Sequence, residues 1–219
     1  MSKQSRSETL SHIISSGVVA VIRMRDNKRL LNVIEAIRVG GVKSIEITMT
    51  VPGAVDIIGE LVKSVPEDVI IGAGTVTDVE TATAVIGKGA RFVVGPILDL
   101  DVVKTCHERD TVVIPGCFSP TEILSGWNAG ADVIKVFPAS SLGTKYLKDI
   151  RTLFPDVRLM PTGGVSIENV GEWVEAGAVA VGIGSDLLDN KAIEENRFEV
   201  LTERAKSLVE NFQGARHQR

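Results

Sequence analysis

Asp132-Val-Ile-Lys-Val-Phe-Pro-Ala139 is a short apolar stretch with β-branched residues on both sides of a single lysine, a pattern typical of a buried strand. Similar stretches occur at residues 18–23, 44–48, 69–73, 91–95, 111–114, 158–161 and 179–184, and their starts are 20 to 26 residues apart. Between them, apolar residues recur at helical spacing, and many of these segments close on glycine. Eight strand–helix alternations predict a parallel sheet, and eight strands are enough to close a barrel.

The repeat therefore predicts a (β/α)8 TIM barrel that occupies residues 1–219 as a single domain. Residues 6–16 are expected to form an extra helix ahead of the first strand. An open, doubly wound parallel sheet is the alternative, although such sheets usually have fewer strands. No Gly/Ser-rich linker or change in composition indicates a second domain.

Composition excludes several classes of function. Aromatic residues make up only 4% of the chain, so Ala, Val, Ile and Gly must provide the core, as in strands that are covered on both faces. The net charge of −4 argues against nucleic-acid binding. Since no apolar run reaches about 18 residues and the first residues lack a signal-peptide pattern, we expect a cytoplasmic protein that does not enter a membrane.

Lys135 is the first candidate for chemistry, because lysine is rarely buried without a partner. Loss of hydration lowers the pKa of an amine, and a neutral amine can attack a ketone to form a Schiff base. The alternative is a lysine whose charged end reaches solvent. Glu46 lies near the end of the second predicted strand, flanked by Ile45 and Ile47, and this strand lies opposite the sixth in a barrel. We expect Glu46 and Lys135 to meet at the barrel axis, as an acid–base couple or as a structural ion pair.

Glycine-rich loops follow the seventh and eighth predicted strands, as Pro161-Thr-Gly-Gly-Val-Ser166 and Gly182-Ile-Gly-Ser185. Barrels often bind phosphate at this pair of strands, where glycine lets backbone N–H groups approach an anion. Tight turns without a ligand are the simpler interpretation. Gly72-Ala-Gly-Thr75 closes the third strand, either as a plain turn or as an opening in which the Thr75 hydroxyl faces a ligand.

The sequence does not indicate a metal site. The three histidines, His12, His107 and His217, do not cluster, and the two cysteines, Cys106 and Cys117, fit neither a zinc motif nor a disulfide framework. Chemistry through an imine is therefore favoured over chemistry through a metal.

Several short motifs occur in order along nearly the whole chain: Gly40-Gly41, Glu46-Ile-Thr48, Gly72-Ala-Gly-Thr-Val76, Pro115-Gly116, Thr121-Glu122, Lys135-Val-Phe-Pro-Ala139, Pro161-Thr-Gly-Gly-Val165 and Gly182-Ile-Gly-Ser185. In combination they resemble the class I aldolases for 2-keto-3-deoxy-6-phosphogluconate (KDPG) and 4-hydroxy-2-oxoglutarate (KHG). Each motif alone is weak, whereas the set is specific.

The resemblance implies a homotrimeric lyase that needs neither metal nor cofactor and that reversibly cleaves KDPG to pyruvate and glyceraldehyde 3-phosphate. Cleavage of KHG to pyruvate and glyoxylate is a second candidate reaction. Lys135 would be the Schiff-base residue and Glu46 the general acid/base. The expected pyruvyl pocket comprises Thr75, Pro96 and Phe137, and the expected phosphate site comprises Gly163, Gly164, Gly184 and Ser185.

Two positions depart from the family pattern. Thr50 stands where many members carry an arginine that binds the substrate carboxylate, and Gly95 stands where many carry serine. Arg23, near the end of the first strand, is the expected replacement cation. These departures concern the choice among keto acids of the gluconate or galactonate series, with or without phosphate. Other possible functions are a sugar-phosphate isomerase or epimerase, which would leave the buried lysine unexplained, and a non-catalytic sensor of a phosphorylated metabolite.

Overall fold

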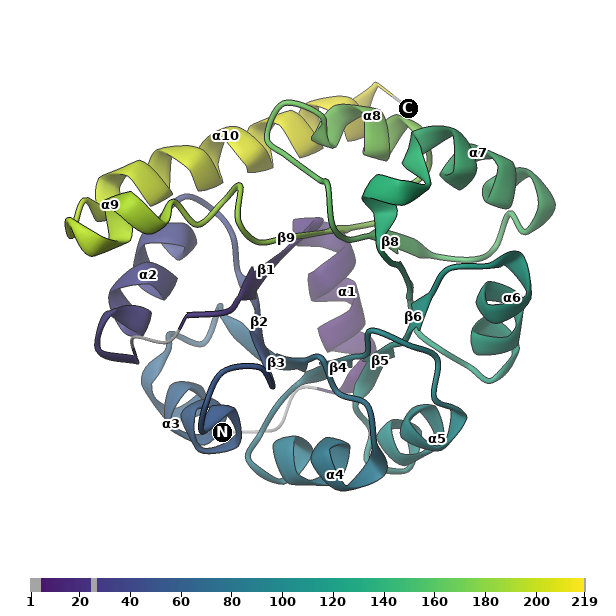
Figure 1. Ribbon diagram of the computed structural model, residues 1–219, viewed down its shortest axis with the longest axis horizontal. Helices are drawn as coiled ribbons and strands as arrows, with labels where there is room; N and C mark the ends of the chain where they lie inside the picture. The colour runs from purple at the N-terminus through teal and green to yellow at the C-terminus, as the bar shows by residue number, and fades with distance from the viewer. Residues whose placement is uncertain (1–4, 25–26, 219) are drawn as a thin grey trace.

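A computed structural model describes residues 5–24 and 27–218 and contains parallel strands that curl around a centre, with helices outside them (Figure 1). The strands are β1 (Val18–Ile22), β2 (Ser44–Thr48), β3 (Ile70–Gly74), β4 (Phe92–Val94), β5 (Val112–Ile114), β6 (Gly116–Cys117), β7 (Ile134–Val136), β8 (Leu159–Pro161) and β9 (Val181–Ile183). The α/β class and the parallel sheet predicted from the sequence are confirmed.

The helices alternate with the strands along the chain. They are α1 (Arg6–Ser16), α2 (Asn27–Val39), α3 (Ala54–Ser64), α4 (Val79–Gly87), α5 (Leu100–Glu108), α6 (Pro120–Asn128), a 3₁₀ turn η1 (Ala139–Ser141), α7 (Gly143–Leu153), α8 (Val170–Glu175), α9 (Asn190–Glu194) and α10 (Phe198–His217). Within the described residues, no helix combines the length and the apolar character needed to cross a membrane.

Helix starts follow from local sequence. In α6, the Ser119 hydroxyl accepts the Glu122 N–H, the Glu122 carboxylate accepts the Ser119 N–H, and Pro120 fills the first helical position. This reciprocal capping satisfies backbone donors that have no partner within the helix. Asp78 and Asp99 cap α4 and α5 in the simpler one-sided way.

The strands form two parallel sheets, in the orders β5-β4-β3-β2-β1-β9 and β6-β7-β8. One predicted strand is split, because Pro115 separates β5 from β6. Proline has no N–H to donate, and its carbonyl accepts the Lys135 N–H at 2.9 Å. Isolated parallel bridges, Thr162 to Gly182 and Leu159 to Ala178, connect the second sheet with the chain of β9.

The interior of the curled sheet is apolar near the N-terminal ends of the strands. Its buried cluster consists of Ile13, Val19, Ile70, Phe92, Val94, Val112, Ile114, Val133, Met160 and Ala180. Most of these side chains come from alternate positions of the strands, and Ile13 comes from α1, which contacts β1, β2 and β5. In Figure 1, α1 lies across the middle of the ring of strands. Since α1 covers this end, the opposite, C-terminal end is left for a site.

Gly72 tests how tightly this interior is packed. A methyl group added there would overlap the fully buried Phe92 ring. Gly72→Ala should therefore lower the free energy of unfolding by about 1–3 kcal/mol, the usual cost of overpacking. Urea unfolding followed by circular dichroism measures the change.

Gly87→Ala is the matched control, because Gly87 ends α4 and an added methyl there would meet nothing within 4 Å. It should leave the free energy of unfolding unchanged or raise it slightly. Equal effects of the two substitutions would contradict the tight contact between Gly72 and Phe92.

Candidate functional site

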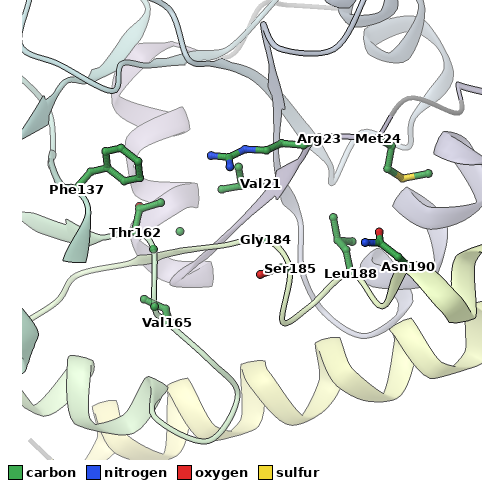
Figure 2. Close-up of a pocket in the computed structure, with 13 residues that line it drawn as sticks. Val21, Arg23, Met24, Phe137, Thr162, Val165, Gly184, Ser185, Leu188 and Asn190 are labelled. Atoms are coloured by element: carbon green, nitrogen blue, oxygen red, sulfur yellow. The ribbon is translucent and has the colours of Figure 1, made fainter. Parts of the chain in front are cut away.

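A cavity of about 270 Å³ opens at the C-terminal ends of β1, β7, β8 and β9 (Figure 2). It brings together six of the residues expected at the site: Arg23, Phe137, Gly163, Gly164, Gly184 and Ser185. Its remaining lining residues are Val21, Met24, Thr162, Val165, Gly182, Leu188 and Asn190. The cavity therefore lies where the fold was expected to place its site.

Lys135 lies behind one wall of this cavity. It is central in β7, opposite Gly116 of β6 and Met160 of β8, and its residue is only 2% exposed. Its amine nitrogen is 4.8 Å from the centre of the Phe137 ring, which lines the cavity. The expectation of a buried lysine is met, and the alternative in which its charge reaches solvent is excluded.

Glu46 is buried on β2, 1% exposed, in register with Val21 of β1 and Gly72 of β3. Its carboxylate rests against Gly74, where any larger residue would collide with it. Neither carboxylate oxygen has a hydrogen-bond partner among the described residues. An unpaired buried carboxylate is costly, and protonation relieves that cost.

The two groups influence each other's pKa. Burial raises the pKa of the Glu46 carboxyl, while the positive charges of Lys135 and Arg23 act in the opposite direction. Burial lowers the pKa of the Lys135 amine, the charge of Arg23 lowers it further, and Glu46 opposes both. Both shifts favour the neutral forms, an amine that can act as a nucleophile and a carboxyl that can donate a proton.

Arg23 is exposed at the end of β1, and its guanidinium extends over the cavity on the side of Phe137 (Figure 2). Thr50 does not line this cavity. The Thr50 hydroxyl is instead 2.6 Å from the Thr48 hydroxyl. Among the residues that line the cavity, Arg23 is therefore the one with a positively charged side chain.

The two glycine loops form the cavity wall below Arg23 in Figure 2, and we call them the β8 loop (residues 162–169) and the β9 loop (residues 184–189). Gly163 and Gly164 have φ values of 85° and 82°, a left-handed conformation that favours glycine. An added methyl at Gly164 would also press on Ser140. Exposed Ser185 follows Gly184 at the cavity wall.

Thr75 and Pro96 are not among the lining residues of the cavity. Thr75, with a left-handed φ of 57°, directly follows Gly74, on which Glu46 rests. The backbone of Pro96 lies against Gly116, the β6 neighbour of Lys135. The two residues therefore lie beside the buried pair, whereas the other expected site residues line the cavity.

The backbone next to Pro96 also accounts for Gly95. A side-chain carbon at that position would lie 2.9 Å from the Ile97 carbonyl oxygen, closer than real contacts allow. A larger residue at position 95 would therefore require this backbone to shift.

Thr162 had no role of its own in the sequence interpretation. Its side chain is buried and faces the cavity, and its hydroxyl has no hydrogen-bond partner among the described residues. Strand alternation was the available signal. Thr162 lies two residues beyond Met160, which is paired with Lys135, so all three side chains share one face.

Neither cysteine offers a reactive thiolate near neutral pH. Burial raises the pKa of the Cys106 and Cys117 thiols to about 12. Across the described parts of the chain, no three His, Cys, Asp or Glu side chains are grouped so that they could hold a metal ion.

Comparison with known proteins gives consistent matches. A sequence model of the family described as KDPG and KHG aldolase matches residues 10–203. A 2-dehydro-3-deoxy-phosphogluconate aldolase of Pseudoalteromonas atlantica is 34% identical over 92% of this chain and 94% of its own length. A 2-dehydro-3-deoxy-6-phosphogalactonate aldolase of Escherichia coli is 31% identical over 78% of this chain and 83% of its own length.

Solved structures agree. KDPG aldolase from Legionella pneumophila, with pyruvate captured as a covalent carbinolamine intermediate, superposes with a TM-score of 0.85. The two chains are 29% identical, and the match covers 91% of this chain and 97% of the other.

The electrostatics of the buried pair predict how amine reactivity depends on pH. Since burial and Arg23 lower the pKa of Lys135, reductive trapping of a 2-keto acid should reach half its maximal rate below the ordinary lysine value of about 10.4. Arg23→Met removes a positive charge and should move this midpoint to higher pH. Trapping rates with cyanoborohydride across a pH series measure it.

Arg38→Met is the control, because Arg38 pairs with Glu35 on the surface of α2 and has no part in the Lys135 shift. Its midpoint should equal that of the unsubstituted protein. If Arg23→Met left the midpoint unchanged, this result would contradict the influence of Arg23 on the pKa of the Lys135 amine.

Proposed function

The chain belongs to the KDPG and KHG aldolase family, and from that premise we propose that it cleaves KDPG to pyruvate and glyceraldehyde 3-phosphate through a Schiff base on Lys135. Members of this family are class I aldolases, lyases that break a carbon–carbon bond without a metal, and this chain is one of them. Cleavage of KHG to pyruvate and glyoxylate is the second candidate reaction.

One observation supports the assignment of roles: a buried lysine occurs beside a cavity together with a buried carboxyl that has no hydrogen-bond partner in the described part of the chain. Both groups have pKa shifts toward the neutral form. A structural ion pair would satisfy its oxygens through hydrogen bonds, and this carboxyl accepts none from the residues that the structure describes. The acid–base interpretation of Glu46 and Lys135 is therefore preferred over the structural one.

Imine formation uses both groups. The neutral amine of Lys135 attacks the C2 ketone and forms a carbinolamine. Protonated Glu46 then supplies a proton to the leaving hydroxyl, which departs as water and leaves a protonated imine. The Glu46 carboxylate that results is stabilised by the new positive charge next to it.

Bond cleavage follows from the charge on the imine. Glu46, now ionised, removes the proton of the C4 hydroxyl, and the electrons of the C3–C4 bond move into the protonated imine. The aldehyde product leaves, and an enamine of pyruvate remains on Lys135. Protonation at C3 and hydrolysis release pyruvate and restore the amine.

The other expected residues hold the two ends of the substrate. Arg23 would bind the carboxylate, in place of the arginine that many members carry at the position of Thr50. Thr75, Pro96 and Phe137 would surround the pyruvyl carbons next to Lys135. Gly163, Gly164, Gly184 and Ser185 would bind the phosphate through backbone N–H groups and a hydroxyl, since left-handed glycines expose their N–H groups to an anion.

We also infer that the two sheets make up one closed eight-stranded barrel in a single domain. Support comes from both junctions. Only Pro115 separates β5 from β6, and Thr162 bridges to Gly182 at the other side. Such closure would put the interior faces of β2 and β7, and therefore Glu46 and Lys135, around one axis.

A homotrimer is the proposed assembly, and its contact face would include exposed apolar residues at the ends of β4 and β6. Ile97, Leu100 and Phe118 are each about half exposed. The Gly116 N–H donates to the Ile97 carbonyl at 3.2 Å, so the segments that carry Ile97 and Phe118 lie side by side. Neighbouring exposed apolar side chains of this size are typical of a surface that another subunit covers.

The family match does not favour the isomerase, epimerase or sensor functions. Within the aldolase function, relatives named for the gluconate and for the galactonate series are similarly close to this chain. Pyruvate release from KDPG, its galactonate epimer, their non-phosphorylated analogues and KHG would rank these substrates.

Covalent trapping tests the proposed nucleophile. Incubation with pyruvate and borohydride should attach one reduced pyruvyl group per chain, at Lys135, and peptide mass mapping would locate it. Lys135→Met keeps an unbranched side chain but removes the amine that forms the imine, so labelling and KDPG cleavage should both disappear. Labelling at another lysine, or cleavage that survives in this variant, would overturn the assignment.

Ser185 tests the phosphate site. Ser185→Ala should weaken KDPG binding by about 1.5–3 kcal/mol, the usual contribution of a hydrogen bond to a charged group, and the KM for KDPG should rise accordingly. The KM for the non-phosphorylated analogue should not change. Arg23→Met is the comparison variant. It removes the partner of the substrate carboxylate and should therefore weaken the binding of both substrates. Equal losses on both substrates in the Ser185 variant would mean that the glycine loops are only turns.

A further inference from the structure

Asp186 and Arg204 form a group of contacts just outside the cavity that the mechanism above does not use. Asp186 directly follows Ser185 in the β9 loop, and Arg204 lies on α10. The Arg204 Nε donates to the Asp186 carbonyl at 2.7 Å, and its Nη2 lies 3.2 Å from the Asp186 Oδ1. The other carboxylate oxygen accepts the N–H of Ile167, in the β8 loop, at 2.8 Å. One side chain therefore connects both glycine loops and α10.

The β8 loop is held at further points. The Asn211 side chain on α10 donates to the Ile167 carbonyl at 2.9 Å. Asn169 donates to the Gly164 carbonyl at 2.9 Å and accepts the Ser166 N–H at 2.8 Å. Figure 1 shows α10 running along the outside of α8 and of the chain between β9 and α9, which places it behind both loops.

We propose that Asp186 and Arg204 are positioning residues that fix the spacing of the two glycine loops and thereby set the affinity for phosphorylated substrates. The proposal rests on the proposed function, since it takes these loops as the phosphate site. Neither residue lines the cavity, so both act through Ser185, Gly184 and the β8 loop. Backbone donors bind an anion well only when their positions are fixed before it arrives, because ordering them afterwards consumes binding free energy.

Arg204 has a second, electrostatic effect. The Asp186 carboxylate is one residue from Ser185, and without a partner it would repel a phosphate group. The guanidinium of Arg204 offsets this charge at 3.2 Å. Loss of Arg204 should therefore weaken phosphate binding more than loss of the Asp186 carboxylate.

Four variants separate the two effects. Asp186→Asn keeps an oxygen for the Ile167 N–H, Asp186→Ala removes it, Arg204→Met leaves the carboxylate unpaired, and Asp186→Ala with Arg204→Met removes both groups. KM and kcat are measured for KDPG and for its non-phosphorylated analogue, together with the affinity of each variant for inorganic phosphate by calorimetry. Melting temperatures report on folding.

Asp186→Ala should raise KM for KDPG about threefold to tenfold, with kcat little changed and no effect on the analogue. Asp186→Asn should recover most of that loss. Arg204→Met should raise the same KM about tenfold or more, and the double variant should be no worse than Arg204→Met alone, because it has no unpaired carboxylate. Affinity for inorganic phosphate should follow the same order.

Arg197→Met is the matched control, since Arg197 pairs with Glu195 at 2.7 Å where α10 begins and is not part of either loop. This variant should leave KM and kcat unchanged for both KDPG and its analogue. Equal losses on KDPG and its analogue in Asp186→Ala and Arg204→Met, or losses that follow only the melting temperature, would overturn the positioning role.

The outcome for this proposal can be told apart from the outcome for the proposed function. If Ser185→Ala is selective for KDPG and Asp186→Ala is not, the positioning role fails and the phosphate site stands. If the unsubstituted protein cleaves no keto acid, the proposed function fails, and the affinities for inorganic phosphate then decide the positioning role alone.

Discussion

The removal of water from Lys135 and Glu46 is the constraint on which the rest of the site depends. The sheet interior is apolar from Ile13 up to Phe92 and Val94, and the two ionisable groups are buried above it. Within the described residues, the carboxyl has no hydrogen-bond partner. A folded chain gains no stability from such a pair. The pair persists because apolar packing fixes the surrounding strands. The free energy of that packing offsets the cost of burying a reactive, neutral amine.

Repetition in the sequence was enough to predict the class of fold, because strands alternate with segments of helical spacing and many of those segments close on glycine. It did not predict that Pro115 divides one strand into β5 and β6, since the interruption follows from a missing donor rather than from hydropathy. The last helix, α10, was not singled out either. Its contacts with α2 and α8 are made between segments far apart in sequence.

Site residues were predictable to the extent that strand alternation and loop position specify them. Lys135 and Glu46 lie within strands, whereas Arg23 and the glycine loops follow strand ends, and the structure places the last two at one cavity. Thr162 received no role because a hydroxyl in a short motif carries no charge pattern, although alternation puts it on the same face as Lys135. Asp186 and Arg204 were out of reach, because only the folded chain brings α10 behind the two loops.

The crowded backbone at Gly95 has a consequence for protein engineering of this segment. A side-chain carbon at position 95 would lie 2.9 Å from the Ile97 carbonyl oxygen, so a larger residue there requires the neighbouring backbone to shift. A larger residue placed at position 95 without a change in the loop would leave a contact that the loop has to relieve by moving. Grafting a loop into or out of this chain therefore has to carry position 95 and the residues that follow it together.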